Sequence, residues 1–255
     1  MRKCAIITAG LVVATLLVGS TVARADYYIK QTKHTDAFTV MGQTQPAKDE
    51  TNVTWISKTM GRFDNGDETT VIVDPAKKVM YWLNHSEKTY SEMPLLMGDI
   101  LDKMVETASE DADEEGKAMA EQMGKLAGSM MEMDIKVTKT QETKKIEKWN
   151  CRKYLLEIKM AMGGATAESW ATTDVKIDPN LYWMTANAMM AGQPGFEEGF
   201  KEMQKIEGVI VYQETKTKAM GAEVKSVDKV VDIQEKAAPA GTYSIPSGYK
   251  KVEGM

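Results

Sequence analysis

The residue types that carry out most enzyme chemistry are scarce in this 255-residue chain. It contains two histidines, His34 and His85, and two cysteines, Cys4 and Cys151. Both histidines fall in or at the ends of segments that read as exposed strands, and the common nucleophile, metalloprotease and phosphate-loop motifs are missing from the sequence. A nucleophile pair of Cys151 with a histidine would require the two side chains to be adjacent in the fold. The sequence therefore predicts a protein that is not an enzyme and that uses no cofactor.

An acidic stretch offers one candidate metal site. Asp111, Asp113 and Glu115 stand at alternate positions before Gly116, as the oxygen ligands and the turn glycine do in the first half of a calcium loop. The twelfth position holds Gln122, where such a loop needs a bidentate carboxylate. A solvated acidic break between two helices is the favoured interpretation, and calcium binding is the alternative.

Methionine is the conspicuous excess, with 20 in the chain. Thioethers are soft ligands that suit Cu(I), so Met130, Met131 and Met133 form a second candidate metal site. Methionine side chains also line adaptable apolar grooves and fill ordinary cores. Because Met119, Met123 and Met130 recur at the spacing of a helical core face, core packing is favoured first, an apolar groove second and a copper site third.

The elements that must position these residues follow from hydrophobic periodicity. Alternating residues predict strands over 27–33, 38–44, 53–62, 69–74 and 79–85, and again over 135–146, 149–162 and 165–172. Helical patterns predict an insertion at about 94–133 and helices over 181–190 and 194–205, followed by strands over 209–217, 223–235 and 243–252. The predicted fold class is α+β, with one curved antiparallel sheet that buries its apolar face against inserted helices in a single domain.

The first 25 residues read as a cleaved secretory signal peptide. Arg2 and Lys3 precede an apolar run of roughly 14 residues, and Ala23-Arg24-Ala25 gives the small-x-small pattern of a cleavage site. The run is shorter than the roughly 20 residues of a spanning helix, so no transmembrane anchor is expected after cleavage. The sequence thus predicts an exported protein that begins at Asp26.

The mature chain would be acidic. The full chain has 32 basic and 37 acidic residues, and loss of Arg2, Lys3 and Arg24 leaves 29 basic residues and a net charge of −8. This balance argues against nucleic acid or an anionic membrane surface as the main partner. Cys151 would be the one remaining cysteine, so no internal disulfide can form, and a buried thiol is favoured over an intermolecular bridge.

Six segments in chain order share the pattern of a known family: VIVD (71–74), KVMYWL (78–83), KTYSEMP (88–94), WNCRKY (149–154), ESWAT (168–172) and GTYSIPSGY (241–249). Together they resemble the DUF4412 family of exported bacterial proteins, which look like relatives of the LolA-like lipoprotein carriers of the periplasm. The resemblance implies a half-barrel wrapped around helices, an apolar concavity, a periplasmic location and a carrier-like role. It places no catalytic residue on this sequence.

The leading functional hypothesis is a binding protein that holds a lipid or an acylated polypeptide between its sheet and the methionine-rich helices. One alternative is an envelope metal-binding protein that uses the methionine or acidic residues above. The other is a protein-interaction module with no small ligand, which meets its partner through a sheet edge. The oligomeric state stays open. The residues expected to contact an apolar ligand are Leu96, Ile100, Met104, Met119, Met123, Met130, Trp170 and Trp183.

Overall fold

The computed structural model describes residues 25–94, 133–160, 163–177, 179–186, 196–219 and 221–253, together with Gly116, Met119 and Gln122, which are helical. The predicted signal peptide and nearly all of the predicted insertion at 94–133 lie outside these residues. The described strands are β1 (Asp26–Thr35), β2 (Phe38–Val40), β3 (Gln43–Gln45), β4 (Lys48–Ile56), β5 (Gly61–Asn65), β6 (Thr69–Asp74), β7 (Val79–Asn84), β8 (Thr89–Pro94), β9 (Met133–Ile146), β10 (Trp149–Met160), β11 (Gly163–Thr172), β12 (Val209–Ala219), β13 (Ala222–Lys236) and β14 (Lys250–Lys251).

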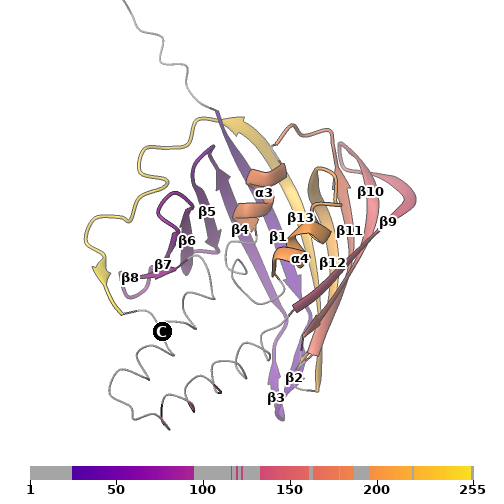
Figure 1. The fold of residues 1–255 in the computed structure, drawn as a ribbon, viewed down its shortest axis with the longest axis horizontal. Helices are drawn as coiled ribbons and strands as arrows, with labels where there is room; N and C mark the ends of the chain where they lie inside the picture. The colour runs from indigo at the N-terminus through magenta and orange to yellow at the C-terminus, as the bar shows by residue number, and fades with distance from the viewer. Residues whose placement is uncertain are drawn as a thin grey trace, which may run out of the picture.

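Twelve of these strands form one curved sheet in the order β14-β8-β7-β6-β5-β4-β1-β13-β12-β11-β10-β9, as Figure 1 shows. Neighbouring strands run antiparallel except β14 and β8, which are parallel. β1 lies between two meanders, because it pairs with β4 on one side and with β13 on the other. The sheet therefore consists of an N-terminal meander, β4–β8, and a C-terminal meander, β9–β13, that share one central strand.

Two reversals interrupt segments whose alternation predicted continuous strands. Met41 and Gly42 both have positive φ angles, of 50° and 78°, and they turn the chain between β2 and β3. Ser57 turns the chain between β4 and β5, because its hydroxyl accepts a hydrogen bond from the Met60 amide at 2.9 Å. The predicted strands over 38–44 and 53–62 are thus each two strands.

The predicted α+β fold class is wrong, and with it the expected half-barrel wrapped around inserted helices. The described part of the chain is mostly β, with 64% of its residues in strands and 7% in helices. The described helical segments of eight residues are α3 (Pro179–Ala186) and α4 (Phe196–Met203), and residues 187–195 between them lie outside the described residues. The strands of the C-terminal meander are 10 to 15 residues long, so strand pairing and not helix packing accounts for most of the architecture.

The helices lie against one face of the C-terminal meander, inside the curve of the sheet (Figure 1). Trp183 of α3 and Met203 of α4 are 3% and 6% exposed in a core cluster with Leu156 of β10 and Ile135 of β9. Next to it lies a second cluster, which contains Ile29, Trp149, Cys151, Trp170 and Val211. None of the described helices is long and apolar enough to cross a membrane.

The C-terminal segment runs back along the N-terminal meander mostly as turns. A strand was predicted over 243–252, but only β14 forms there, since Gly241 and Gly248 adopt positive φ angles on either side of Pro246. The segment is held to β8 by backbone bonds from Lys250 to Lys88 and from Val252 to Tyr90.

Candidate ligand-binding site

A cavity of about 300 Å³ lies between the C-terminal meander and helices α3 and α4. One part of its wall is apolar and is formed by Leu156 and Ile158 of β10, Ile210 of β12, Trp183 of α3 and Met203 of α4. Long strands with inward-facing aliphatic residues supply the sheet side of this wall, and the two helices supply the other side. We call this space the cavity.

Two glycines allow the helices to approach the sheet. A Cβ atom on Gly61 of β5 would lie 2.3 Å from Thr185 Cγ2 of α3, and a Cβ on Gly199 of α4 would lie 2.8 Å from Ile135 Cδ1 of β9. Real Cβ atoms do not approach other heavy atoms so closely, because dispersion turns to repulsion at such distances. The glycines therefore set the positions of α3 and α4 over the cavity.

The other part of the cavity wall is polar and comes from β1, β12 and β13. Its polar lining residues are Gln31, Gln213, Asp228 and Lys229, and the same strands also contribute Val211, Tyr212 and Val230. Asp228 is the ladder partner of Lys33 in β1 and of Gln213 in β12, and Gln213 is the partner of Ser169 in β11. Because directly paired residues of neighbouring strands share one face of a sheet, these side chains form a polar row across it.

The members of this row are bonded to very different extents. Gln213 is fixed at both ends, since its Nε2 donates to Thr215 Oγ1 at 3.0 Å and its Oε1 accepts from Ser169 Oγ at 3.0 Å. In the described part of the chain, neither the Asp228 carboxylate nor the Gln31 amide makes a side-chain hydrogen bond or ion pair. Both side chains are partly buried, and their hydrogen-bonding capacity is open to a ligand.

Burial shifts the pKa values of two side chains that line the cavity, Asp228 and Tyr182. Burial raises the pKa of Asp228, Lys33 opposes that rise, and Glu50 adds to it. Burial also raises the pKa of Tyr182, on α3 at the apolar side, to about 12, against a backbone hydrogen bond with Ile210. The phenol is therefore neutral at physiological pH, and Asp228 is the acidic group that lines the cavity.

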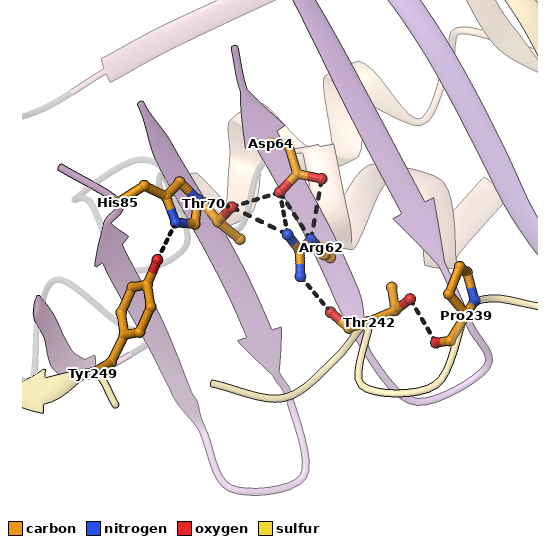
Figure 2. Close-up of polar contacts among 7 residues, drawn as sticks. All are labelled: Arg62, Asp64, Thr70, His85, Pro239, Thr242 and Tyr249. Carbon is orange, nitrogen blue, oxygen red and sulfur yellow. Dashed lines mark hydrogen bonds and ion pairs between the residues drawn. The ribbon is translucent and has the colours of Figure 1, made fainter. Parts of the chain in front are cut away.

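A second polar cluster lies on the N-terminal meander, and Figure 2 shows it. Arg62 Nε and Nη2 each lie 2.8 Å from Asp64 Oδ1. The Thr70 hydroxyl donates to the same oxygen at 2.5 Å and lies 2.8 Å from His85 Nε2. His85 Nδ1 lies 2.6 Å from the Tyr249 hydroxyl. We call these five residues the C-terminal latch, because Tyr249 belongs to the returning C-terminal segment.

The geometry of the latch favours a structural role. Arg62 Nη1 donates to the Thr242 carbonyl oxygen at 2.9 Å, so the latch grips the C-terminal segment at two points (Figure 2). Thr70 is fully buried, so its hydroxyl cannot reach a substrate, and both ring nitrogens of His85 are engaged. Each of the five latch side chains thus has a hydrogen-bond partner, either in the latch or in the C-terminal segment.

A cleft of about 770 Å³ borders the latch and is lined by charged side chains of both signs. Lys48 Nζ lies 2.7 Å from Glu50 Oε1, and Arg62 pairs with Asp64 as described above. Asp67 and Glu68 also line the cleft, so acidic side chains outnumber basic ones in its lining.

The structure brings one of the predicted ligand-contacting residues, Trp183, into the cavity wall. Trp170 does not line the cavity: it packs in the neighbouring core cluster, and Lys144 Nζ lies 4.0 Å from the centre of its ring. Met119 is helical and 62% exposed. The remaining predicted contacts, Leu96, Ile100, Met104, Met123 and Met130, lie outside the described residues.

The candidate metal ligands fare similarly. Met133 is 4% exposed and belongs to the core cluster beneath α4, where its neighbours are apolar. Met130, Met131, Asp111, Asp113 and Glu115 lie outside the described residues. Within those residues, no group of three or more histidine, cysteine and acidic side chains is arranged to hold a metal ion.

The candidate nucleophile is also accounted for by packing. Cys151 is 3% exposed, burial raises its pKa, and its thiol donates to the Trp149 carbonyl oxygen at 3.6 Å. A protonated, inaccessible thiol is inert. His34, the second histidine, lies 2.7 Å from Asp49 Oδ1 on an exposed strand, and this contact with the carboxylate raises its pKa.

The sequence analysis did not identify Gln31, Gln213 and Asp228 as residues of the site.

No family model matches the chain, and no curated protein matches its sequence. The resemblance to the exported family and its carrier-like fold therefore stays a prediction.

Proposed function

We propose that this protein is a non-enzymatic binding protein that holds an apolar ligand in the cavity between the C-terminal meander and helices α3 and α4. The observation that carries the proposal is the wall itself, which is apolar on the side of Trp183 and Met203 and polar on the side of Asp228. Removing this apolar wall from water would be favourable, and the polar side chains beside it leave hydrogen-bonding capacity for a ligand.

The size of the cavity limits the classes of ligand that fit in it. About 300 Å³ is at the lower end of the roughly 300 to 1,000 Å³ that small-molecule sites occupy. One unbranched acyl or alkyl chain matches that space, whereas a lipid with several chains exceeds it. The ligand proposed is therefore a single-chain lipid, or the single chain of a larger acylated molecule, and not a complete multi-chain lipid.

The proposed site of action is outside the cytoplasm. Its support is the predicted signal peptide, with the basic start at Arg2 and Lys3 and the cleavage pattern that ends at Ala25. The non-enzymatic reading is supported by the inaccessible Cys151 thiol and by His85, whose ring nitrogens are engaged in the C-terminal latch.

The test uses decanol, an uncharged single-chain ligand, in calorimetric titrations of the purified protein. Ile158 is partly buried at the cavity, so Ile158→Trp should fill the space and weaken decanol binding by about tenfold or more. Leu155 lies on the same strand but is 40% exposed and does not line the cavity, so Leu155→Trp is the matched control and should change the affinity by less than about twofold.

Native mass spectrometry of the protein isolated from its own cells complements the titration. An added mass that matches a single-chain lipid, lost on denaturation, is the expected result. Absence of decanol binding to the unaltered protein, or equal binding by the Ile158→Trp and Leu155→Trp variants, would remove the cavity as the ligand site.

A further inference from the structure

We infer that the ligand is a single-chain amphiphile with a positively charged, hydrogen-bond-donating head, held by the Asp228 carboxylate and the Gln31 amide at the polar side of the cavity. This inference rests on the proposed function, since it names the head group of the molecule whose chain the apolar wall accepts. The chemical class is an alkyl ammonium compound or an acyl chain that ends in an amine.

The first support is the change from apolar to polar lining residues between the helix side and the sheet side of the cavity. Trp183 and Met203 close the side beneath the helices, while Gln31 and Asp228 lie across it on β1 and β13. A molecule with uniform polarity would leave one of the two sides mismatched. An amphiphile with its chain under the helices satisfies both sides.

The second support is the bonding capacity that is left at the polar side. Gln213 uses both ends of its amide within the sheet, so it is not available to a ligand without a loss. The Asp228 carboxylate and the Gln31 carbonyl oxygen are both acceptors, and in the described residues neither is bonded through its side chain. An ionised Asp228 can only accept hydrogen bonds and Gln31 can present its carbonyl oxygen, so the polar side favours a head group that donates hydrogen bonds.

The third support is the sign of the charge. Lys229, the next residue after Asp228, also lines the cavity, but its Nζ lies 2.6 Å from Glu147 Oε1 and is thereby committed to that partner. Lys33 attracts Asp228 but forms no ion pair with it among the described residues, and the carboxylate of Glu50 repels it. A cationic head would supply the missing counter-charge, whereas an anionic head would face the Asp228 carboxylate.

The test compares three ligands with the same ten-carbon chain, namely decylamine, decanol and decanoate, titrated calorimetrically below their micelle concentrations. Decylamine should bind the unaltered protein at least tenfold more tightly than decanoate. Asp228→Asn should abolish that preference while changing the affinity for decanol by less than about twofold. Asp232→Asn is the matched control. Asp232 lies on the same strand, opposite Lys30 in the ladder with β1, and does not line the cavity.

The outcomes separate the two proposals. Equal binding of all three ligands, tighter binding of decanoate, or a preference for decylamine that survives Asp228→Asn would overturn the inference about the head group and leave the chain site standing. Failure of every ligand to bind would overturn the proposed function, and the head-group inference with it.

Discussion

The two meanders of the sheet contain partly buried aspartates in opposite states of bonding. In the N-terminal meander, Asp64 accepts bonds from Arg62 and Thr70, and the chain of contacts continues to His85 and Tyr249. In the C-terminal meander, Asp228 lines a cavity, and within the described residues its carboxylate makes no hydrogen bond or ion pair. Two aspartates on strands of one sheet thus have different environments.

We interpret this difference as one between groups that stabilise the fold and groups that would contact the proposed ligand. A polar network in which every member is paired rigidifies the structure, and the C-terminal latch does so by joining a distant segment to β5–β7. Groups left without partners cost stability, and such a cost is typical of binding sites. The distinction predicts that changes in the two meanders will have opposite effects on stability and on binding.

The largest effect on stability is expected in the latch. Arg62→Met removes the cation from Asp64 and a donor from the Thr242 carbonyl, and should lower the free energy of unfolding by about 2–3 kcal/mol, measured by urea denaturation. Lys251→Met is the control. The exposed pair of Lys251 with Glu92 also ties the C-terminal segment to the sheet, but its loss should leave the free energy of unfolding nearly unchanged, because surface ion pairs contribute little. Similar losses in the two variants would contradict the structural role of the latch.

A smaller effect is expected where α3 spans from the N-terminal meander to the cavity. Gly61→Ala places a methyl group 2.3 Å from Thr185 Cγ2, so α3 must move away from β5. We expect a loss of about 1–2 kcal/mol in the free energy of unfolding, together with weaker decanol binding, because Trp183 on the same helix lines the cavity.

The Thr185→Ala variant provides the control for this contact. It removes the nearest side-chain atoms, so the double variant Gly61→Ala with Thr185→Ala should recover part of both the stability and the decanol affinity. Strict additivity of the two single changes in a double-mutant cycle would show that the glycine does not position α3.

The meander strands were the part of the fold that sequence could predict. Long alternating segments gave β9, β10, β11, β12 and β13 nearly at their true limits, because a half-buried strand keeps a period of two. The turns at Met41 and Ser57 were missed. Methionine is unusual at a positive φ angle, and the Ser57 turn depends on a side-chain bond that alternation does not reveal.

The candidate site was less accessible to sequence analysis. Trp183 was noticed because it is a large aromatic residue on a predicted helix, yet nothing in the sequence of β13 distinguishes Asp228 from other charged residues on alternating strands. Asp228, Gln213 and Gln31 come together through the register of β1, β12 and β13, and register between strands distant in sequence follows from the whole fold. The error in fold class has a related cause. Short helical patterns were interpreted as a layer of helices packed on the sheet, and a pattern along the chain does not show how much of the sheet the helices cover.

The smallest effect, and the most discriminating, is expected for Asp228→Asn, which should stabilise the protein, whereas the substitutions above destabilise it. Burial raises the pKa of this carboxyl above its ordinary value, so its contribution to folding is fully favourable below that ordinary value and is lost as the pH rises through the folded-state pKa. Asn is neutral at every pH. Asp228→Asn should therefore raise the melting temperature of the ligand-free protein slightly at neutral pH, and the difference should vanish in acid.

The groups around Asp228 set the size and the limits of this effect. Lys33 reduces it, Glu50 increases it, and Lys229 is held by Glu147, so thermal unfolding should be followed at low ionic strength. Asp64→Asn is the counterpart in the latch and should lower the melting temperature at neutral pH, because it weakens bonds to Arg62 and Thr70. If both substitutions destabilised the protein, Asp228 would belong to the fold as Asp64 does. Stabilisation by Asp228→Asn together with loss of the decylamine preference would mean that the carboxylate is kept for binding at a cost to the empty protein.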